Sequence, residues 1–128
     1  MSIVDQLEKE HAVILSLLEE ARQAGITTAD GFGKLRKAKS VILNHLEKEE
    51  REIYPRLREE AHMASEFKDE MSTLSKTFLD FYARCESGAA PAELAAEAGR
   101  VVGALKMRIV REERVLYPSW KRATGEAA

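Results

Sequence analysis

The sequence predicts an all-α fold, a single up-down-up-down antiparallel four-helix bundle over residues 1–128 with a pseudo-twofold internal repeat. Residues of high helix propensity dominate the chain, which contains only three prolines and seven glycines. β-Branched residues never alternate with polar ones over a strand-length window. Four stretches instead repeat apolar residues at spacings of three and four, as one face of a helix requires. A chain of 128 residues has the length of one domain.

The first two predicted helices cover residues 2–24 and 29–54. The residues that share one face of the first helix are Val4, Leu7, His11, Ile14, Leu18 and Ala21. Gly25 is the expected stop of this helix. The stripe of the second helix holds Leu35, Ala38, Ile42, His45 and Glu49, with Leu46 and Ile53 beside it. We expect Pro55 to bend or end the second helix, because proline lacks an N–H and its ring clashes with the preceding turn.

The third predicted helix runs from residue 60 or 64 to 86, and the fourth covers residues 91–117. The stripe of the third helix holds Ala64, Phe67, Met71, Leu74, Phe78 and Phe81. Pro91 suits the first position of the fourth helix. The stripe of the fourth helix holds Val101, Leu105, Arg108, Glu112 and Leu116. We expect Pro118 to bend or end the fourth helix, as Pro55 does the second.

Composition and charge exclude several classes of function. The 20 basic and 22 acidic side chains are interspersed and give a net charge of −2, so no basic face predicts nucleic-acid binding. Cys85 is the single cysteine, and the N-terminus lacks the pattern of a signal peptide, so we expect a reducing, cytoplasmic setting. No apolar stretch is long enough to predict a membrane span. The sequence contains no motif that pairs a nucleophile with a base and no glycine-rich phosphate loop. We therefore favour a binding protein over an enzyme.

The two halves of the chain form a weak internal repeat. Residues 7–14 match residues 67–74, and residues 45–55 match residues 108–118. The matched pairs that carry chemistry are His11 with Met71, His45 with Arg108, Glu49 with Glu112, and Tyr54 with Tyr117.

Polar side chains interrupt the apolar stripes at one level of the predicted bundle. They are His11, His45, Glu49, Arg108 and Glu112. Unpaired charge inside a bundle costs several kcal/mol, so these side chains need a partner. His45 and Glu49 are one helical turn apart and could hold one cation together. The two carboxylates and Arg108 leave a charge of −1, which a divalent ion, a proton or a protonated histidine would each offset.

The motifs EHxxI at residues 10–14, HxxxEExxxYP at 45–55 and RxxxEExxxYP at 108–118 resemble the hemerythrin-like, HHE cation-binding family. The resemblance covers about residues 3–120. It implies a bundle that holds two non-haem irons, with one histidine from each helix and glutamates that bridge the metals, for binding or sensing oxygen, nitric oxide or iron. It assigns metal-ligand roles to His11, His45, Glu49 and Glu112.

The sequence departs from this family pattern in one half of the expected site. Met71 and Arg108 stand where the third and fourth helices should each offer a histidine. The resemblance then implies a centre of two imidazoles and two carboxylates for a single ion, because Arg108 repels a second cation. Iron is the expected metal, with zinc or manganese as alternatives.

Each of these residues can also have a purely structural role, which leads to a second hypothesis. Arg108 can satisfy Glu112 as an ion pair, and Met71 can serve as core packing. Tyr54 and Tyr117 are expected to pack the end of the bundle, although a tyrosine near a metal could become a ligand or a hydrogen-bond partner. The chain would then be a metal-free structural or regulatory bundle in which Arg108 neutralises the core carboxylates. The sequence also leaves open a homodimer and a small diatomic ligand.

Overall fold

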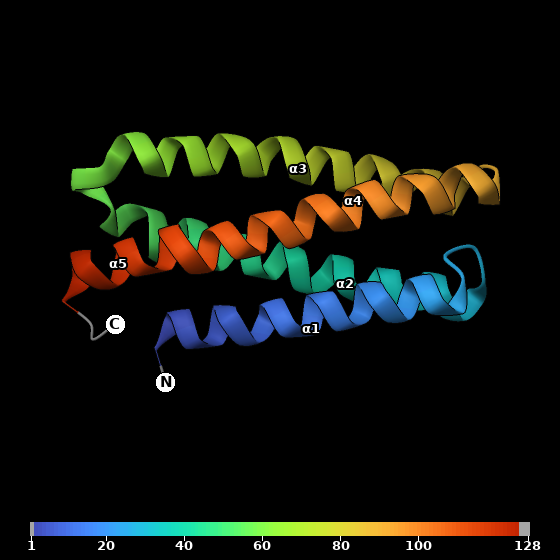
Figure 1. Cartoon of the computed structure of the whole chain (residues 1–128), viewed down its shortest axis with the longest axis horizontal. Coiled ribbons are helices and arrows are strands. Elements are labelled where there is room, and N and C mark those ends of the chain that lie inside the picture. Colours follow the sequence, from blue (N-terminus) through green and yellow to red (C-terminus); the bar gives the residue numbers. More distant parts are fainter. Residues whose placement is uncertain (1, 126–128) are drawn as a thin grey trace.

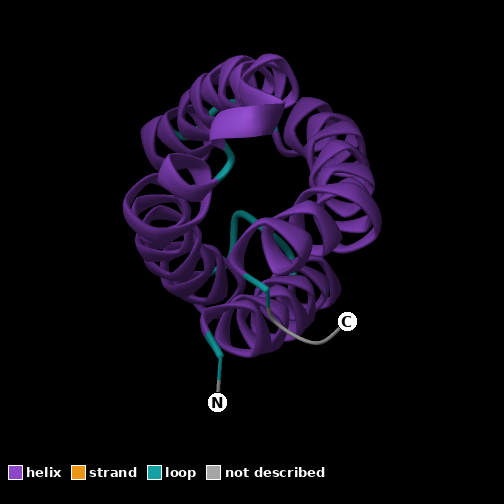
Figure 2. Cartoon of the chain, turned by 90° about the vertical axis from the view of Figure 1, so that its left-hand side faces the viewer, coloured by secondary structure: helices purple, strands orange, loops and turns teal. Residues whose placement is uncertain are grey.

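The computed structural model describes residues 2–125 as an antiparallel bundle of four long helices (Figure 1). The elements are α1 (Ile3–Ala24), α2 (Ala29–Lys48), α3 (Ala61–Ser87) and α4 (Pro91–Arg111), followed by the short α5 (Tyr117–Thr124). Viewed end-on, the helices form a closed ring around one core, and no strand occurs in the described residues (Figure 2). The all-α four-helix fold is thus confirmed.

The turn between α1 and α2 sets the register of the first helix pair. Gly25 ends α1 with a φ of 94°, a left-handed conformation that favours glycine. The Thr28 side chain then caps α2 by accepting a hydrogen bond from the Gly31 backbone N–H. A Cβ atom at Gly31 would lie 1.8 Å from the carbonyl oxygen of Gly25, so the close approach of the two segments requires glycine there. This tight turn holds α1 and α2 side by side.

Two apolar clusters fill the bundle, one on each side of a polar layer. The larger cluster includes Ile14, Ile42 and Leu105, and the smaller includes Leu7, Ile53 and Leu116. Five of the six buried polar residues fall between these positions: His11 on α1, His45 in the last turn of α2, Glu49 directly after α2, Arg108 in the last turn of α4, and Glu112 directly after α4. The sixth, Ser119, lies on α5. The apolar clusters therefore exclude water from a polar layer that crosses the bundle.

The α-helical hydrogen-bond pattern changes at the same place in both halves of the repeat. A π-helical turn covers Glu49–Ile53 (η1) after α2, and another covers Glu112–Leu116 (η4) after α4. The backbone N–H groups of Tyr54 and Tyr117 each donate to the carbonyl five residues earlier. The proline that follows each tyrosine has no N–H to donate to the preceding turn, which explains why the turn widens there.

These turns correct the predicted ends of two helices. The expected helix 29–54 is α-helical only to Lys48, and short 3-10 turns, η2 (Tyr54–Arg56) and η3 (Arg58–Glu60), lead into α3. The expected helix 91–117 is α-helical only to Arg111, and after the π turn the chain continues past Pro118 as α5. Pro118 is the second residue of α5, in the first turn of a helix, where proline is tolerated.

None of the helices within residues 2–125 is both long and apolar enough to cross a membrane.

Candidate metal centre

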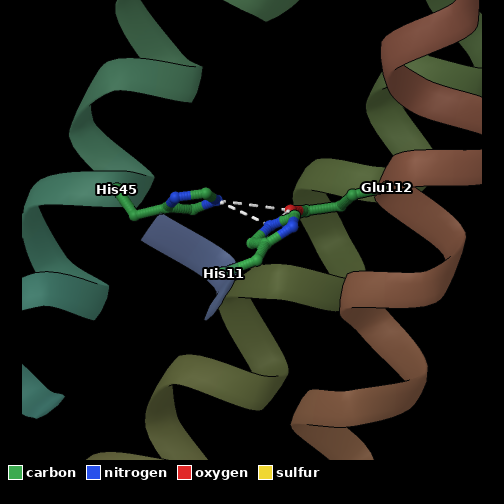
Figure 3. A group of neighbouring side chains, drawn as sticks. All are labelled: His11, His45 and Glu112. Carbon is green, nitrogen blue, oxygen red and sulfur yellow. Dashed lines mark hydrogen bonds and ion pairs between the residues drawn. The ribbon is translucent and has the colours of Figure 1, made fainter. Parts of the chain in front are cut away.

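Side chains from three parts of the chain meet in the polar layer. The Nε2 atoms of His11 and His45 lie 3.2 Å apart, and Glu112 Oε1 lies 2.8 Å from the first and 3.3 Å from the second (Figure 3). One ligand atom from each of these three buried residues falls within 4.8 Å of the others. Glu49 lies at the edge of this group, with Oε2 3.4 Å from His45 Nε2. The structure therefore brings together all four predicted ligand residues.

The hydroxyl of Tyr117 lies among these four side chains. It donates at 2.9 Å to Glu49 Oε2 and at 3.0 Å to Glu112 Oε1, and it is 3.2 Å from His11 Nε2 and 3.3 Å from His45 Nε2. Burial next to the charges of Glu112 and Glu49 raises the pKa of Tyr117, so the phenol stays neutral and keeps its proton. Tyr117 is thus part of the centre.

Tyr117 packs in the smaller apolar cluster, as predicted, and the π turn also brings its hydroxyl to the centre as a hydrogen-bond partner. In a regular α-helix, residues five positions apart point about 140° away from each other, at about 100° per residue. The wider η4 turn instead places Tyr117 over Glu112. The sequence signal for this contact is the proline that follows the tyrosine, because it interrupts the regular hydrogen bonding of the helix.

Two further carboxylates orient the histidine rings from outside. Glu113 Oε2 lies 2.7 Å from His11 Nδ1, and Glu10 Oε1 lies 2.9 Å from His45 Nδ1. An ionised carboxylate only accepts hydrogen bonds, so each ring carries its proton on Nδ1 and directs Nε2 inward. Sequence reasoning missed both glutamates. The available signal was their position, since Glu10 directly precedes His11 and Glu113 directly follows Glu112.

The hydrogen-bond acceptors of the centre outnumber the hydrogens that its side chains supply when both histidines are neutral. When both rings are neutral, His11 Nε2, His45 Nε2, Glu49 Oε2 and Glu112 Oε1 are all acceptors. Among the described side chains, the Tyr117 hydroxyl supplies the single hydrogen shared by these four atoms. The acceptors repel one another unless a metal ion or added protons lie between them. Two imidazoles with carboxylates form a donor set that fits a first-row divalent metal.

Arg108 occupies the other half of the polar layer. Its Nε donates at 2.9 Å to Glu112 Oε2, and Nη2 donates at 2.9 Å to the Tyr54 hydroxyl. The guanidinium carbon lies 4.6 Å from the centre of the Phe67 ring, an attractive cation–π arrangement. Within residues 2–125 the buried Nη1 makes no hydrogen bond, and Glu70 Oε2 is 3.8 Å away. A fixed positive charge thus stands where the repeat would place a second histidine.

The buried groups shift one another's proton affinities. Burial opposes a charge on His45, but hydrogen bonds to Glu112 and Glu49 outweigh it and raise the pKa of His45 to about 10. Burial and the charge of Glu112 raise the pKa of Glu49 to about 7. Burial also opposes the charge of Glu112, yet hydrogen bonds to His11 and His45 and the charge of Arg108 hold its pKa well below the usual range. Glu112 is therefore the carboxylate that stays ionised.

The other residues singled out in the sequence lie away from the centre or at its edge. Met71 on α3 is 7% exposed and lies in the wall of a groove between α2 and α3. His62 is at the surface, with a side chain that is 92% exposed. Cys85 is buried in the larger apolar cluster, where burial raises the pKa of its thiol.

Comparison with known proteins gives one match. The model of the hemerythrin HHE cation-binding domain matches residues 2–120. No curated protein and no solved structure matches the chain. The family match spans nearly the whole bundle and includes both helix ends that form the polar layer. The chain therefore belongs to the hemerythrin HHE cation-binding domain family.

Proposed function

We propose that this chain binds a single non-haem iron ion through His11, His45, Glu49 and Glu112, and that it handles or senses iron, oxygen or nitric oxide. The observation that carries the proposal is the convergence of four buried acceptor atoms on one phenolic hydrogen. Two imidazoles and a carboxylate are the ligand types of non-haem iron sites, and zinc and manganese accept the same donors. Iron bound with an open coordination position supplies the capacity to bind a small ligand.

The second half of the layer supports one ion instead of two. Arg108 places a permanent charge one helical turn from Glu112, and Met71 offers a thioether where the repeat calls for an imidazole. Thioethers favour soft ions such as Cu(I) over iron. A second hard cation would meet the repulsion of the guanidinium in a medium that screens it poorly.

Elemental analysis of the purified, iron-reconstituted protein tests this function. We expect one metal per chain in the wild type, and loss of the metal in His45→Ala and in Glu49→Ala. His62→Ala is the matched control, because this histidine is exposed. Stoichiometric metal that survives both core substitutions places the site elsewhere.

The second candidate is a metal-free bundle with a structural or regulatory role. The observation in its favour is that Arg108 already binds Glu112, while a proton on His45 completes the balance of charge. A ligand that binds only the folded state raises its stability by mass action. A melting temperature that is unchanged by chelators and by added iron favours this candidate.

A further inference from the structure

The outward face of α4 carries apolar side chains that no other part of the described chain covers. Met107 is 70% exposed and Val110 is 45% exposed. In Figure 1, α4 runs along the near side of the bundle between α3 and α1, with no segment in front of it. Residues three and four apart share one face of a helix, so this face continues from Met107 toward the start of α4 and from Val110 into η4. We call it the α4 stripe, and its members, all exposed or half-buried, are Ala92, Ala96, Gly99, Gly103, Met107, Val110 and Arg114.

Two glycines in the middle of the α4 stripe are not required by packing within the chain. A Cβ atom at Gly103 would meet no described atom within 4 Å, and a Cβ atom at Gly99 would meet one side-chain atom, Arg22 Nη2, at 3.8 Å. Both residues lie inside α4, where glycine costs about 1 kcal/mol of helix stability relative to alanine. A glycine on a helix surface also lets another segment approach the backbone closely. The stripe is therefore shaped for a neighbour that the described chain does not supply.

The order of side-chain sizes makes the α4 stripe complementary to itself. Small residues, Ala96 and Gly99, precede Gly103, whereas large ones, Met107 and Val110, follow it. Met107 and Gly99 are equally far from Gly103 along the chain, and so are Val110 and Ala96. When two copies of α4 pack antiparallel with Gly103 against Gly103, each large side chain therefore faces a small one, as close packing requires. A parallel pair would instead place Met107 against Met107.

Charges at the two ends of the α4 stripe agree with the same antiparallel pairing. Glu93 lies in the first turn of α4, and its side chain is 70% exposed. Arg114 lies beyond the other end of the helix, in η4, and is also exposed. The two residues are almost equally far from Gly103, so the antiparallel pair brings Glu93 of each copy close to Arg114 of the other. Twofold symmetry gives two such contacts, whereas a parallel pair would set like charges against each other.

The two basic side chains nearest Gly103 do not face each other in this pairing. Arg100 and Lys106 lie on opposite edges of the stripe, because six residues turn a helix through about 600°, which leaves the two side chains about 120° apart. In an antiparallel pair with twofold symmetry, each edge of the stripe meets the same edge of the second copy. Arg100 therefore faces the uncharged Ala104 of the second copy.

We propose that the α4 stripe is the interface of a homodimer, in which α4 packs antiparallel against α4 of a second copy about a twofold axis at Gly103. The stripe lies on the side of α4 opposite the buried Leu105, so the contact leaves both metal centres unchanged and does not depend on metal binding. A contact made by one helix from each copy is at the small end of specific interfaces. We therefore expect a dissociation constant of about 1–100 µM.

Sedimentation velocity across protein concentrations of about 1–500 µM tests the dimer. Gly103→Leu is the decisive variant, because its side chain points into open space in one copy but fills the contact at the twofold axis. It should raise the melting temperature at a concentration where the protein is monomeric, since leucine favours helix, and yet weaken association by at least about tenfold. Gly33→Leu on α2 is the matched control, because a Cβ atom there also meets no described atom within 4 Å. This control should stabilise the monomer and leave association unchanged.

Charge reversal tests the antiparallel register. Glu93→Arg and Arg114→Glu should each weaken the dimer several-fold, because each change creates two like-charge contacts. The combination of both substitutions restores opposite charges and should recover the wild-type dissociation constant. A wild-type protein that stays monomeric at every concentration overturns the proposal, as does a dimer that Gly103→Leu leaves intact. A combined variant that associates no better than the single ones overturns the antiparallel pairing.

Discussion

The Nε2 atoms of His11 and His45 lie 3.2 Å apart in a dry layer, and the Nδ1 atom of each ring faces a different carboxylate. Two imidazole nitrogens at this distance share a proton or a metal ion. Competition between these two cations would make the centre sensitive to pH and to metal.

The stability of the metal-free protein should fall as the pH rises. The pKa of His45 is raised from 6.5 to about 10, so its contribution is fully present below pH 6.5 and is lost as the pH rises through about 10. The raised pKa of Glu49, about 7, acts in the same direction, because the folded state binds the extra proton. Urea denaturation across this range measures the effect. If the free energy of unfolding rises with pH instead, protons on His45 and Glu49 do not stabilise the polar layer.

Replacing Tyr117 with phenylalanine should destabilise the metal-free protein by about 1–3 kcal/mol, because two buried carboxylates lose their hydrogen-bond donor. Chemical denaturation with and without Fe²⁺ measures the change. The loss should be smaller in the metal-loaded protein, in which the ion replaces the missing hydrogen. Tyr82→Phe, in the larger apolar cluster, is the control for loss of a tyrosine hydroxyl. Equal losses in both metal states mean that the hydroxyl acts independently of the cation site.

The outer carboxylates should tune metal affinity. Glu113→Gln and Glu10→Gln remove the charge that orients His11 and His45, so each should weaken metal binding by about 10–100-fold. Competition with a coloured chelator measures the affinity. Glu47→Gln is the matched control, since that side chain is 72% exposed. If neither Glu113→Gln nor Glu10→Gln changes the metal affinity, packing alone orients the two histidine rings.

The double substitution Met71→His and Arg108→His should raise the iron content from one ion per chain to two. It restores the imidazoles that the repeat places in the second half of the layer and removes the repelling charge. Elemental analysis after reconstitution measures the stoichiometry, with Arg108→Gln as the variant that removes charge without adding a ligand. A doubly substituted chain that stays at one ion contradicts the pairing of the two repeats.

The sequence predicted the bundle because helical periodicity is set by residues three and four apart, which are visible in one dimension. It also predicted that His11, His45, Glu49 and Glu112 share one level, because polar residues in an apolar stripe must pack against one another. Helical periodicity alone could not place Tyr117, Glu10 and Glu113 against the centre, for different reasons. The first depends on a widened turn, and the other two depend on which neighbouring helix an acidic side chain faces.

The hydrogen bond from Trp120 Nε1 to the carbonyl oxygen of Glu52 is 3.1 Å long and joins α5 to η1. Because η4 directly precedes α5, the direction in which the Trp120 side chain points depends on the geometry of the η4 turn. If the five residues of η4 took regular α-helical geometry instead, everything after them would turn by about 100°. The indole would then point away from the first half of the chain, and the smaller apolar cluster would open next to the carboxylates that it covers. The winding of this one turn therefore matters more than most side-chain exchanges in the same segment.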